Sequence, residues 1–128
     1  MKIIQYLTAV LIIILFGSCQ NTTEEKLIPA TYCGTQDPLE ELAWLKEIKT
    51  NMELAANAVE GQIIAWKYKG ETVFWIDECY SCEDKLIRIY DCTGNKVCEF
   101  GGIGGFDTCD DFQLNASDST MLFNHVQQ

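Results

Sequence analysis

The hydrophobic positions in the middle of the chain first follow the period of a helix. From Pro38 to Ala56, apolar side chains recur three or four positions apart and fall on one face: Leu42, Leu45, Ile48 and Met52. Asp37 precedes Pro38, and Glu40 follows Asp37 by three positions, which is the spacing of a capped helix start. We therefore expect one helix over residues 38–56, with its apolar face on a core.

After residue 61 the pattern changes to that of β-strands. Two runs, Gln62 to Tyr68 and Glu71 to Asp77, are rich in β-branched and aromatic residues, and Lys69-Gly70 between them predicts a hairpin turn. In the second run, large apolar side chains alternate onto both faces. Both faces then need a cover, so we expect this hairpin to lie at the centre of a sheet.

Two further strands complete the predicted domain. Lys85 to Tyr90 has strand composition and turns through Thr93-Gly94-Asn95 into a strand around Lys96 to Phe100. The predicted fold is therefore α+β: one N-terminal helix packed on a four-stranded antiparallel β-meander, spanning residues 33–112. Residues 113–128 are mostly polar, and we expect a loosely ordered C-terminal tail unless Met121-Leu122-Phe123 docks on the domain.

The first residues of the chain have the pattern of an export signal. A positive start, Met1-Lys2, is followed by an apolar run from Ile3 to Phe16 and by the small pair Gly17-Ser18. The run is shorter than the roughly 17 to 25 residues of a membrane-spanning helix, which disfavours a retained anchor helix. We expect residues 1–18 to be a signal peptide.

Leu15-Phe16-Gly17-Ser18-Cys19 resembles the lipobox of bacterial lipoproteins. The resemblance implies that Cys19 becomes the first residue and carries a diacylglycerol thioether and an N-acyl chain, which together anchor a protein stably where one chain would not. The alternative is an ordinary secretory signal with a cysteine there by chance.

The residues after Cys19 bear on the location of the anchor. Gln20 stands where an Asp would favour the inner membrane, so the resemblance implies the outer membrane, facing the periplasm or the cell surface. Residues 19–32 lack apolar periodicity and predict a flexible tether.

The balance of charge limits the partners of this protein. The chain has 19 Asp and Glu against 9 Lys and Arg, and its formal net charge is -10. Nucleic acid and anionic lipid surfaces would both be repelled, so we expect no nucleic-acid partner and membrane contact only through the lipid. An acidic surface suits a solvated domain, and equally a binder of cations or basic partners.

The seven cysteines indicate a disulfide framework. Setting the lipidated Cys19 aside leaves an even set in an exported domain: Cys33, Cys79, Cys82, Cys92, Cys98 and Cys109. Up to three bridges are expected, each worth roughly 2 to 4 kcal/mol in a small domain. We expect Cys98 to pair with Cys109, Cys33 with Cys79 or Cys82, and Cys92 with the remaining one.

Two other interpretations of Cys79-Tyr80-Ser81-Cys82 are less favoured. A redox C-x-x-C needs a thiolate, which cations or a helix N-terminus stabilise, whereas Asp77-Glu78 and Glu83-Asp84 place four negative charges around this pair. A zinc ribbon needs a second closely spaced pair, and Cys92 and Cys98 have five residues between them. We expect each of the two cysteines to pair with a different partner.

Residues 101–112 combine glycine-rich and acidic segments. A phosphate-binding glycine loop needs a following helix N-terminus and usually a basic residue, and neither is predicted here. Asp107, Asp110 and Asp111 have oxygen ligands suited to Ca²⁺ but lack the spacing of an EF-hand. A glycine-rich strand end held by Cys109 is the favoured interpretation, with weak binding by these aspartates as the alternative.

A succession of motifs over residues 33–112 resembles a family of small bacterial lipoproteins that carry a domain of unknown function. The motifs are Trp44-Leu45-Lys46-Glu47, the aromatic hairpin 66–70, the cysteine pair, 86–91 with Gly94-Asn95, Cys98, Gly101-Gly102, Asp107, Cys109 and Asp111-Phe112. The resemblance implies no established activity.

The function we expect is a non-catalytic one. An enzyme needs a nucleophile, an acid/base pair or a metal in a pocket, and the only histidine, His125, lies outside the predicted domain. We therefore expect no catalytic residues, no metal and no cofactor beyond the covalent lipid.

The favoured function is a membrane-anchored binding or interaction module with a protein partner in the envelope or at the surface. The alternatives are an inhibitor of a hydrolase such as a protease or lysozyme, with residues 101–111 as its loop, and then a thiol-redox protein.

Overall fold

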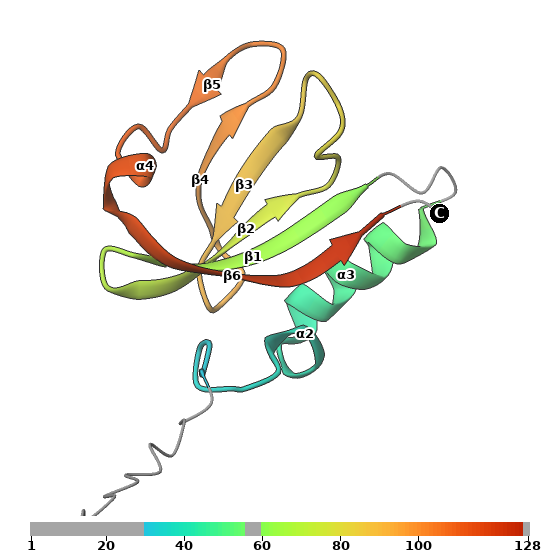
Figure 1. Cartoon of the computed structure of the whole chain (residues 1–128), viewed down its shortest axis with the longest axis vertical. Helices are drawn as coiled ribbons and strands as arrows, with labels where there is room; N and C mark the ends of the chain where they lie inside the picture. Colours follow the sequence, from blue (N-terminus) through green and yellow to red (C-terminus); the bar gives the residue numbers. More distant parts are fainter. Residues whose placement is uncertain (1–29, 56–59, 127–128) are drawn as a thin grey trace, which may run out of the picture.

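The computed structural model describes residues 30–55 and 60–126 of the chain, and the predicted signal peptide and nearly all of the tether lie outside that range. Its centre is a six-stranded antiparallel sheet in the order β5-β4-β3-β2-β1-β6 (Figure 1). The strands are β1 Gly61–Tyr68, β2 Glu71–Asp77, β3 Leu86–Tyr90, β4 Lys96–Gly101, β5 Phe106–Asp107 and β6 Ala116–His125. The helices are α2 Pro38–Glu41, α3 Ala43–Leu54 and α4 Phe112–Asn115. The α+β class is confirmed, with six strands where four were expected.

The β1–β2 hairpin lies in the middle of the sheet, as its two apolar faces predicted. On one face Ile63, Ala65, Phe74 and Ile76 pack with Leu45 and Met52 of α3. On the opposite face a second buried cluster forms from Tyr68, Val73, Ile87, Ile89, Cys98, Cys109 and Phe112. The sheet is thus covered by helices on one side and by the segment after β5 on the other.

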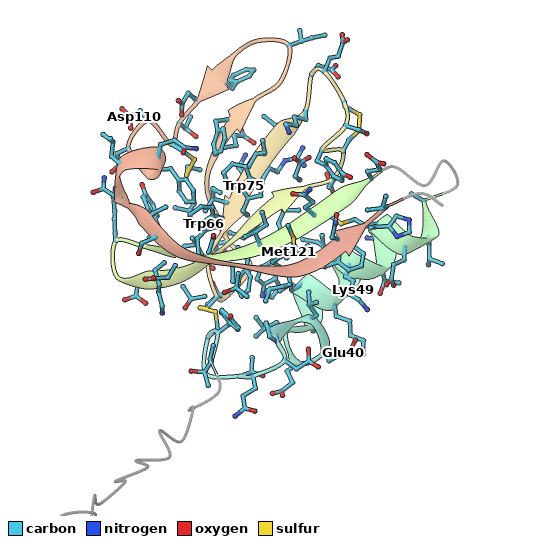
Figure 2. All side chains as sticks on the ribbon, in the orientation of Figure 1. Glu40, Lys49, Trp66, Trp75, Asp110 and Met121 are labelled. Carbon is cyan, nitrogen blue, oxygen red and sulfur yellow. A yellow bond between two sulfur atoms is a disulfide. The ribbon has the colours of Figure 1, made fainter. Side chains whose placement is uncertain are left out.

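Phe112, at the start of α4, is the centre of the second cluster. Its side chain is 1 % exposed. Its ring centroid lies 5.0 Å from that of Tyr68, 5.8 Å from those of Trp66 and Trp75, and 6.3 Å from that of Phe100. Figure 2 shows Trp66 and Trp75 on the side of the sheet away from Glu40 and Lys49. Offset and edge-on aromatic contacts of this kind stabilise by more than their buried area alone.

The C-terminal residues differ from the expected loose tail. Residues 116–125 form β6, which pairs along the free edge of β1, so the sheet domain extends beyond residue 112. Leu122 and Phe123 pack against the α3-side core, which is the docking that would order this segment. A hairpin that is apolar on both faces is buried, so the backbone N–H and C=O groups along its two edges need hydrogen-bond partners in neighbouring strands. β6 provides these partners along β1.

The expected single helix is interrupted at Leu42. Leu42 has φ -88° and ψ 102°, so it ends α2 and precedes α3, and both Leu39 and Leu42 pack against the core. The predicted helix start is confirmed, with Asp37 as the N-cap residue and Pro38 at the first helical position. The expected capping box is absent, because the Asp37 side chain makes no capping hydrogen bond and Glu40 instead forms ion pairs with Lys46 at 2.6 Å and Lys49 at 3.6 Å. Thr35 Oγ1 accepts the N–H of Asp37 at 3.1 Å, so the chain enters α2 through a local turn that the spacing did not reveal.

The β3–β4 turn is fastened to the helical layer by Trp44. The indole N–H of Trp44 donates to the carbonyl of Cys92 at 3.3 Å, and its ring packs against Phe74 and Tyr90 with centroids 5.6 and 5.7 Å away. Gly94, at φ +84°, lies directly over this ring, and a Cβ there would be 2.8 Å from Trp44 Cγ. The turn therefore requires glycine for two reasons, its backbone angle and the space taken by Trp44.

We predict that Gly94→Ala lowers the free energy of unfolding by more than Gly70→Ala does. Gly70 has nearly the same angle, φ +86°, and a Cβ added there would meet nothing within 4 Å. Gly70→Ala therefore costs only the left-handed backbone, about 1 to 2 kcal/mol. Gly94→Ala adds overpacking against Trp44, about 1 to 3 kcal/mol more. Urea denaturation of the two variants measures the difference, and equal losses would contradict the Trp44 contact.

Candidate functional site

Three disulfides join the six cysteines of the described residues: Cys33–Cys92, Cys79–Cys82 and Cys98–Cys109. The expected Cys98–Cys109 bridge is confirmed, and the expected pairing of Cys33 with Cys79 or Cys82 is wrong. Cys79 and Cys82 lie in the β2–β3 turn, whereas Cys92 follows β3 at the opposite end of the sheet, next to the segment that leads into α2. Strand direction therefore brings Cys92, and not the C-x-x-C pair, to Cys33.

The loop lengths indicate how much each bridge constrains the unfolded chain. The paired cysteines are 59 residues apart in Cys33–Cys92, 11 in Cys98–Cys109 and 3 in Cys79–Cys82. Since the stabilisation increases with the logarithm of loop length, it amounts to about 4, 3 and 2 kcal/mol in that order. Cys33–Cys92 thus contributes most and holds the N-terminal segment on the β3–β4 turn.

The Cys79–Cys82 pair closes a turn above a buried carboxylate. Asp77 is 2 % exposed, and its Oδ1 accepts the N–H of Cys79 at 3.1 Å while its Oδ2 lies 3.5 Å from Lys85 Nζ. The Cys82 N–H donates to the Cys79 carbonyl at 3.1 Å. These contacts make the pair a local staple of the turn, in place of the two long-range bridges expected from the sequence.

The Cys98–Cys109 bridge closes a projecting loop. Inside it β4 and β5 pair at Phe100 with Asp107 and at Gly101 with Phe106, and Glu99 exchanges hydrogen bonds of 2.9 Å with Thr108. The loop tip stands beyond the end of the sheet (Figure 1). We call residues 99–108 the closed loop. Its ends are held by a ladder and a disulfide, so its tip has few conformations to lose on binding.

Two large apolar side chains of the closed loop are in water. Ile103 is 91 % exposed and Phe106 is 63 % exposed, although both lie within a few residues of the bridge. The Gly102 N–H donates to the Lys85 carbonyl at 2.7 Å, and the Gly105 N–H donates to the Gly102 carbonyl at 3.0 Å, so the backbone around Ile103 is itself held. An apolar residue presented on a fixed backbone is the type of residue that anchors protein interfaces.

The three aspartates that were candidates for binding have different surroundings. Asp107 Oδ1 accepts the N–H of Cys109 at 2.8 Å, Asp110 is exposed at the periphery (Figure 2), and Asp111 binds to the β1–β2 hairpin. Within residues 30–55 and 60–126, no group of three His, Cys, Asp or Glu side chains is placed to hold a metal ion. Asp107 and Asp111 therefore have structural roles, the first in the turn before Cys109 and the second in a contact with the β1–β2 hairpin.

Asp111 connects the segment after the closed loop to the β1–β2 hairpin. Its carboxylate accepts from Tyr68 Oη and lies 2.5 Å from Lys69 Nζ. These contacts, Lys69 first, lower the pKa of Asp111 below its usual value, and the Asp111 carboxylate raises the pKa of Lys69. Because the folded-state pKa of Asp111 is lowered, its contribution to stability is present above the unfolded-state pKa and is lost as the pH falls toward the folded-state value.

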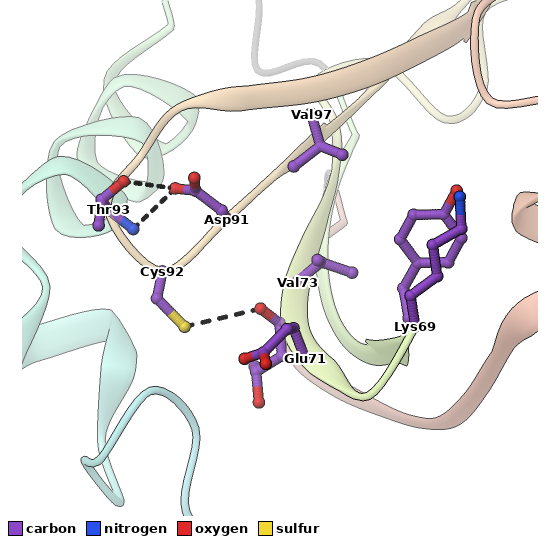
Figure 3. Close-up of a pocket in the computed structure, with 9 residues that line it drawn as sticks. Lys69, Glu71, Val73, Asp91, Cys92, Thr93 and Val97 are labelled. Carbon is purple, nitrogen blue, oxygen red and sulfur yellow. Dashed lines mark hydrogen bonds between the residues drawn. The ribbon is translucent and has the colours of Figure 1, made fainter.

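A hollow of about 350 Å³ lies between the β1–β2 and β3–β4 turns (Figure 3). Its walls come from residues of both hairpins, which are neighbours only because β2 pairs with β3. No motif in the sequence marks it, since its members are ordinary strand and turn residues. Only a correct prediction that β2 pairs with β3 could have indicated this hollow from the sequence.

A family model matches the part of the chain that contains the whole sheet. The model described as "Domain of unknown function (DUF6970)" matches residues 48–125, from within α3 to the end of β6. The match includes the C-terminal strand and covers more than half of the 128-residue chain. No curated protein and no solved structure matches the chain. The chain therefore belongs to the family defined by this domain of unknown function, DUF6970.

Proposed function

We propose that this protein is a lipid-anchored, non-catalytic binding module of the bacterial cell envelope that contacts a protein partner through the closed loop. The anchor rests on the sequence: residues 1–18 as an export signal and Cys19 as the acylated residue, at the outer membrane. None of the helices in the described residues is long and apolar enough to span a membrane. In this proposal the lipid on Cys19 is the membrane attachment, and residues 19–32 are the tether.

The observation that carries the binding role is the exposure of Ile103 and Phe106 on a backbone fixed by Cys98–Cys109. Burying such side chains against a partner gains about 1.5 to 3 kcal/mol each. An anionic membrane is a poor partner for this loop, because Glu99 and Asp107 lie on it and the whole chain has a net charge of -10. A protein surface with an apolar recess fits it better.

Inhibition of a hydrolase is the second candidate function. A rigid projecting loop with one exposed apolar residue at its tip has the form of an inhibitor that enters an active-site cleft, and the acidic surface suits a basic enzyme such as many lysozymes. The same loop serves both functions, so they differ only in what the partner does when bound.

Replacing Cys19 tests the anchor. We predict that Cys19→Ser abolishes fatty-acid labelling of the protein in a bacterial host, because the thiol that accepts the diacylglycerol group is lost. Ser18→Ala, which keeps a small residue before the cysteine, is the matched control and keeps the label. Metabolic labelling with an alkyne-tagged fatty acid, followed by mass spectrometry of the first mature residue, makes the measurement. Equal labelling of Cys19→Ser and the unaltered chain would refute acylation at this position.

A photo-crosslinking residue tests the closed loop as the contact surface. Placed at position 103 in cells, it is predicted to give one discrete protein adduct. The same residue at position 54, where Leu54 is 75 % exposed on α3, is predicted to give none. Adducts of equal yield from both positions, or from neither, would count against the loop.

An activity assay distinguishes the inhibitor function from that of a non-inhibitory binding module. A panel of lysozymes and serine proteases is incubated with the soluble domain, with Ile103→Asp and with Leu54→Asp. Loss of inhibition by Ile103→Asp alone supports this second function, and no inhibition of any panel enzyme leaves the non-inhibitory binding module as the proposal.

A further inference from the structure

The hollow between the two hairpins has an apolar interior. Tyr68, Val73, Val97 and Cys92 contribute to its walls, and Figure 3 shows the side chains of Val73 and Val97 turned toward the open space between the turns. Sγ of Cys92 lies 3.6 Å from the Thr72 carbonyl; as a disulfide sulfur it has no proton, so this is a packing contact that closes the floor. The volume of the hollow, about 350 Å³, is at the small end of ligand pockets and suits one side chain or a small molecule.

One wall of the hollow holds a fixed negative charge. Oδ1 of Asp91 accepts from the Thr93 N–H at 2.8 Å, the Thr93 hydroxyl at 2.7 Å and the Asn95 N–H at 3.0 Å. Oδ2 has only a 3.4 Å contact with Asn95 Nδ2. The hydrogen bonds from Thr93, followed by those from Asn95, lower the pKa of Asp91. Asp91 is therefore held as a carboxylate within the β3–β4 turn, where it adds a fixed negative charge beside the hollow.

The other charges at the rim leave the hollow acidic. Glu71 is exposed at its edge, and none of the ion pairs in the described residues involves it. Lys69, the one cation among the lining residues, is already bound to Asp111 at 2.5 Å. Two acidic residues, Asp91 and Glu71, are thus among the residues that line the hollow, and Lys69, the one lysine or arginine among them, is neutralised by Asp111.

We propose that this hollow receives a lysine or arginine side chain of a basic protein partner. The aliphatic stem of such a side chain covers Val73 and Val97, and its cationic head binds the carboxylate of Glu71 at the edge, with the negative charge of Asp91 adding to the attraction. The net charge of -10 favours the approach of a basic partner over a distance. The proposal goes beyond the closed-loop contact, because the hollow shares no residue with residues 99–108, so either surface can fail its test alone.

Small probes of matched shape test the hollow. The full-length chain is titrated with n-hexylammonium, hexan-1-ol and hexanoate while the backbone amide resonances are followed by NMR. We predict that n-hexylammonium shifts the amides of Val73 and Val97 and binds about tenfold more tightly than hexanoate, with hexan-1-ol between them. No shift at these two amides, or equal affinity for all three probes, would overturn the proposal.

Two variants separate the rim charge from the apolar walls. Glu71→Gln is predicted to weaken n-hexylammonium binding several-fold and to leave hexan-1-ol binding unchanged, because only the charge at the edge is removed. Glu83→Gln, an equal change on the exposed β2–β3 turn, is the control and has no effect on either probe. Since both side chains are exposed, both variants fold, and the dispersion of their amide spectra verifies this. Equal effects of the two variants would refute a role for Glu71.

Discussion

Both faces of the β1–β2 hairpin carry large apolar side chains, so neither face can be left in water. Ile63, Phe74 and Ile76 require the cover that α3 provides, whereas Tyr68 and Val73 require one on the opposite side. The second cover cannot be a long helix, because the chain between β4 and β6 contains only the closed loop and the single turn of α4. One residue, Phe112, fills most of that role by packing among four aromatic rings.

This constraint explains why the exposed surfaces lie where they do. Cys109 and Phe112 are both buried, so the Cys98–Cys109 bridge is itself part of the second core, and the closed loop projects from a rigid base. The same burial brings Asp111 to Tyr68 and Lys69, which takes the Lys69 charge away from the rim of the hollow. The apolar loop tip and the acidic hollow are thus two results of one packing arrangement, and both support a role in binding.

The sequence predicted those parts of the fold that depend on local pattern. The alternation in β1 and β2, the Lys69-Gly70 turn and the Cys98–Cys109 bridge are all determined within short segments. Prediction failed where a contact between segments distant in the sequence determines the structure. Residues 117–121 of β6 are exposed on an edge strand and therefore have a polar pattern, and only the pairing with β1 makes β6 part of the sheet. Cys33 pairs with Cys92 because of strand direction, which cysteine spacing does not encode. The hollow was missed for the same reason, since Asp91 and Glu71 line the same space only because β2 pairs with β3.

The most direct test of this account compares two phenylalanines six residues apart in the chain. Phe112→Ala removes the cover of the second face and is predicted to lower the free energy of unfolding by about 3 to 5 kcal/mol, whereas Phe106→Ala, at a side chain 63 % exposed, changes it by less than about 0.5 kcal/mol. Urea denaturation with the disulfides intact measures both. A loss below about 1 kcal/mol for Phe112→Ala, or equal losses for the two variants, would contradict the claim that the hairpin must be covered on both faces.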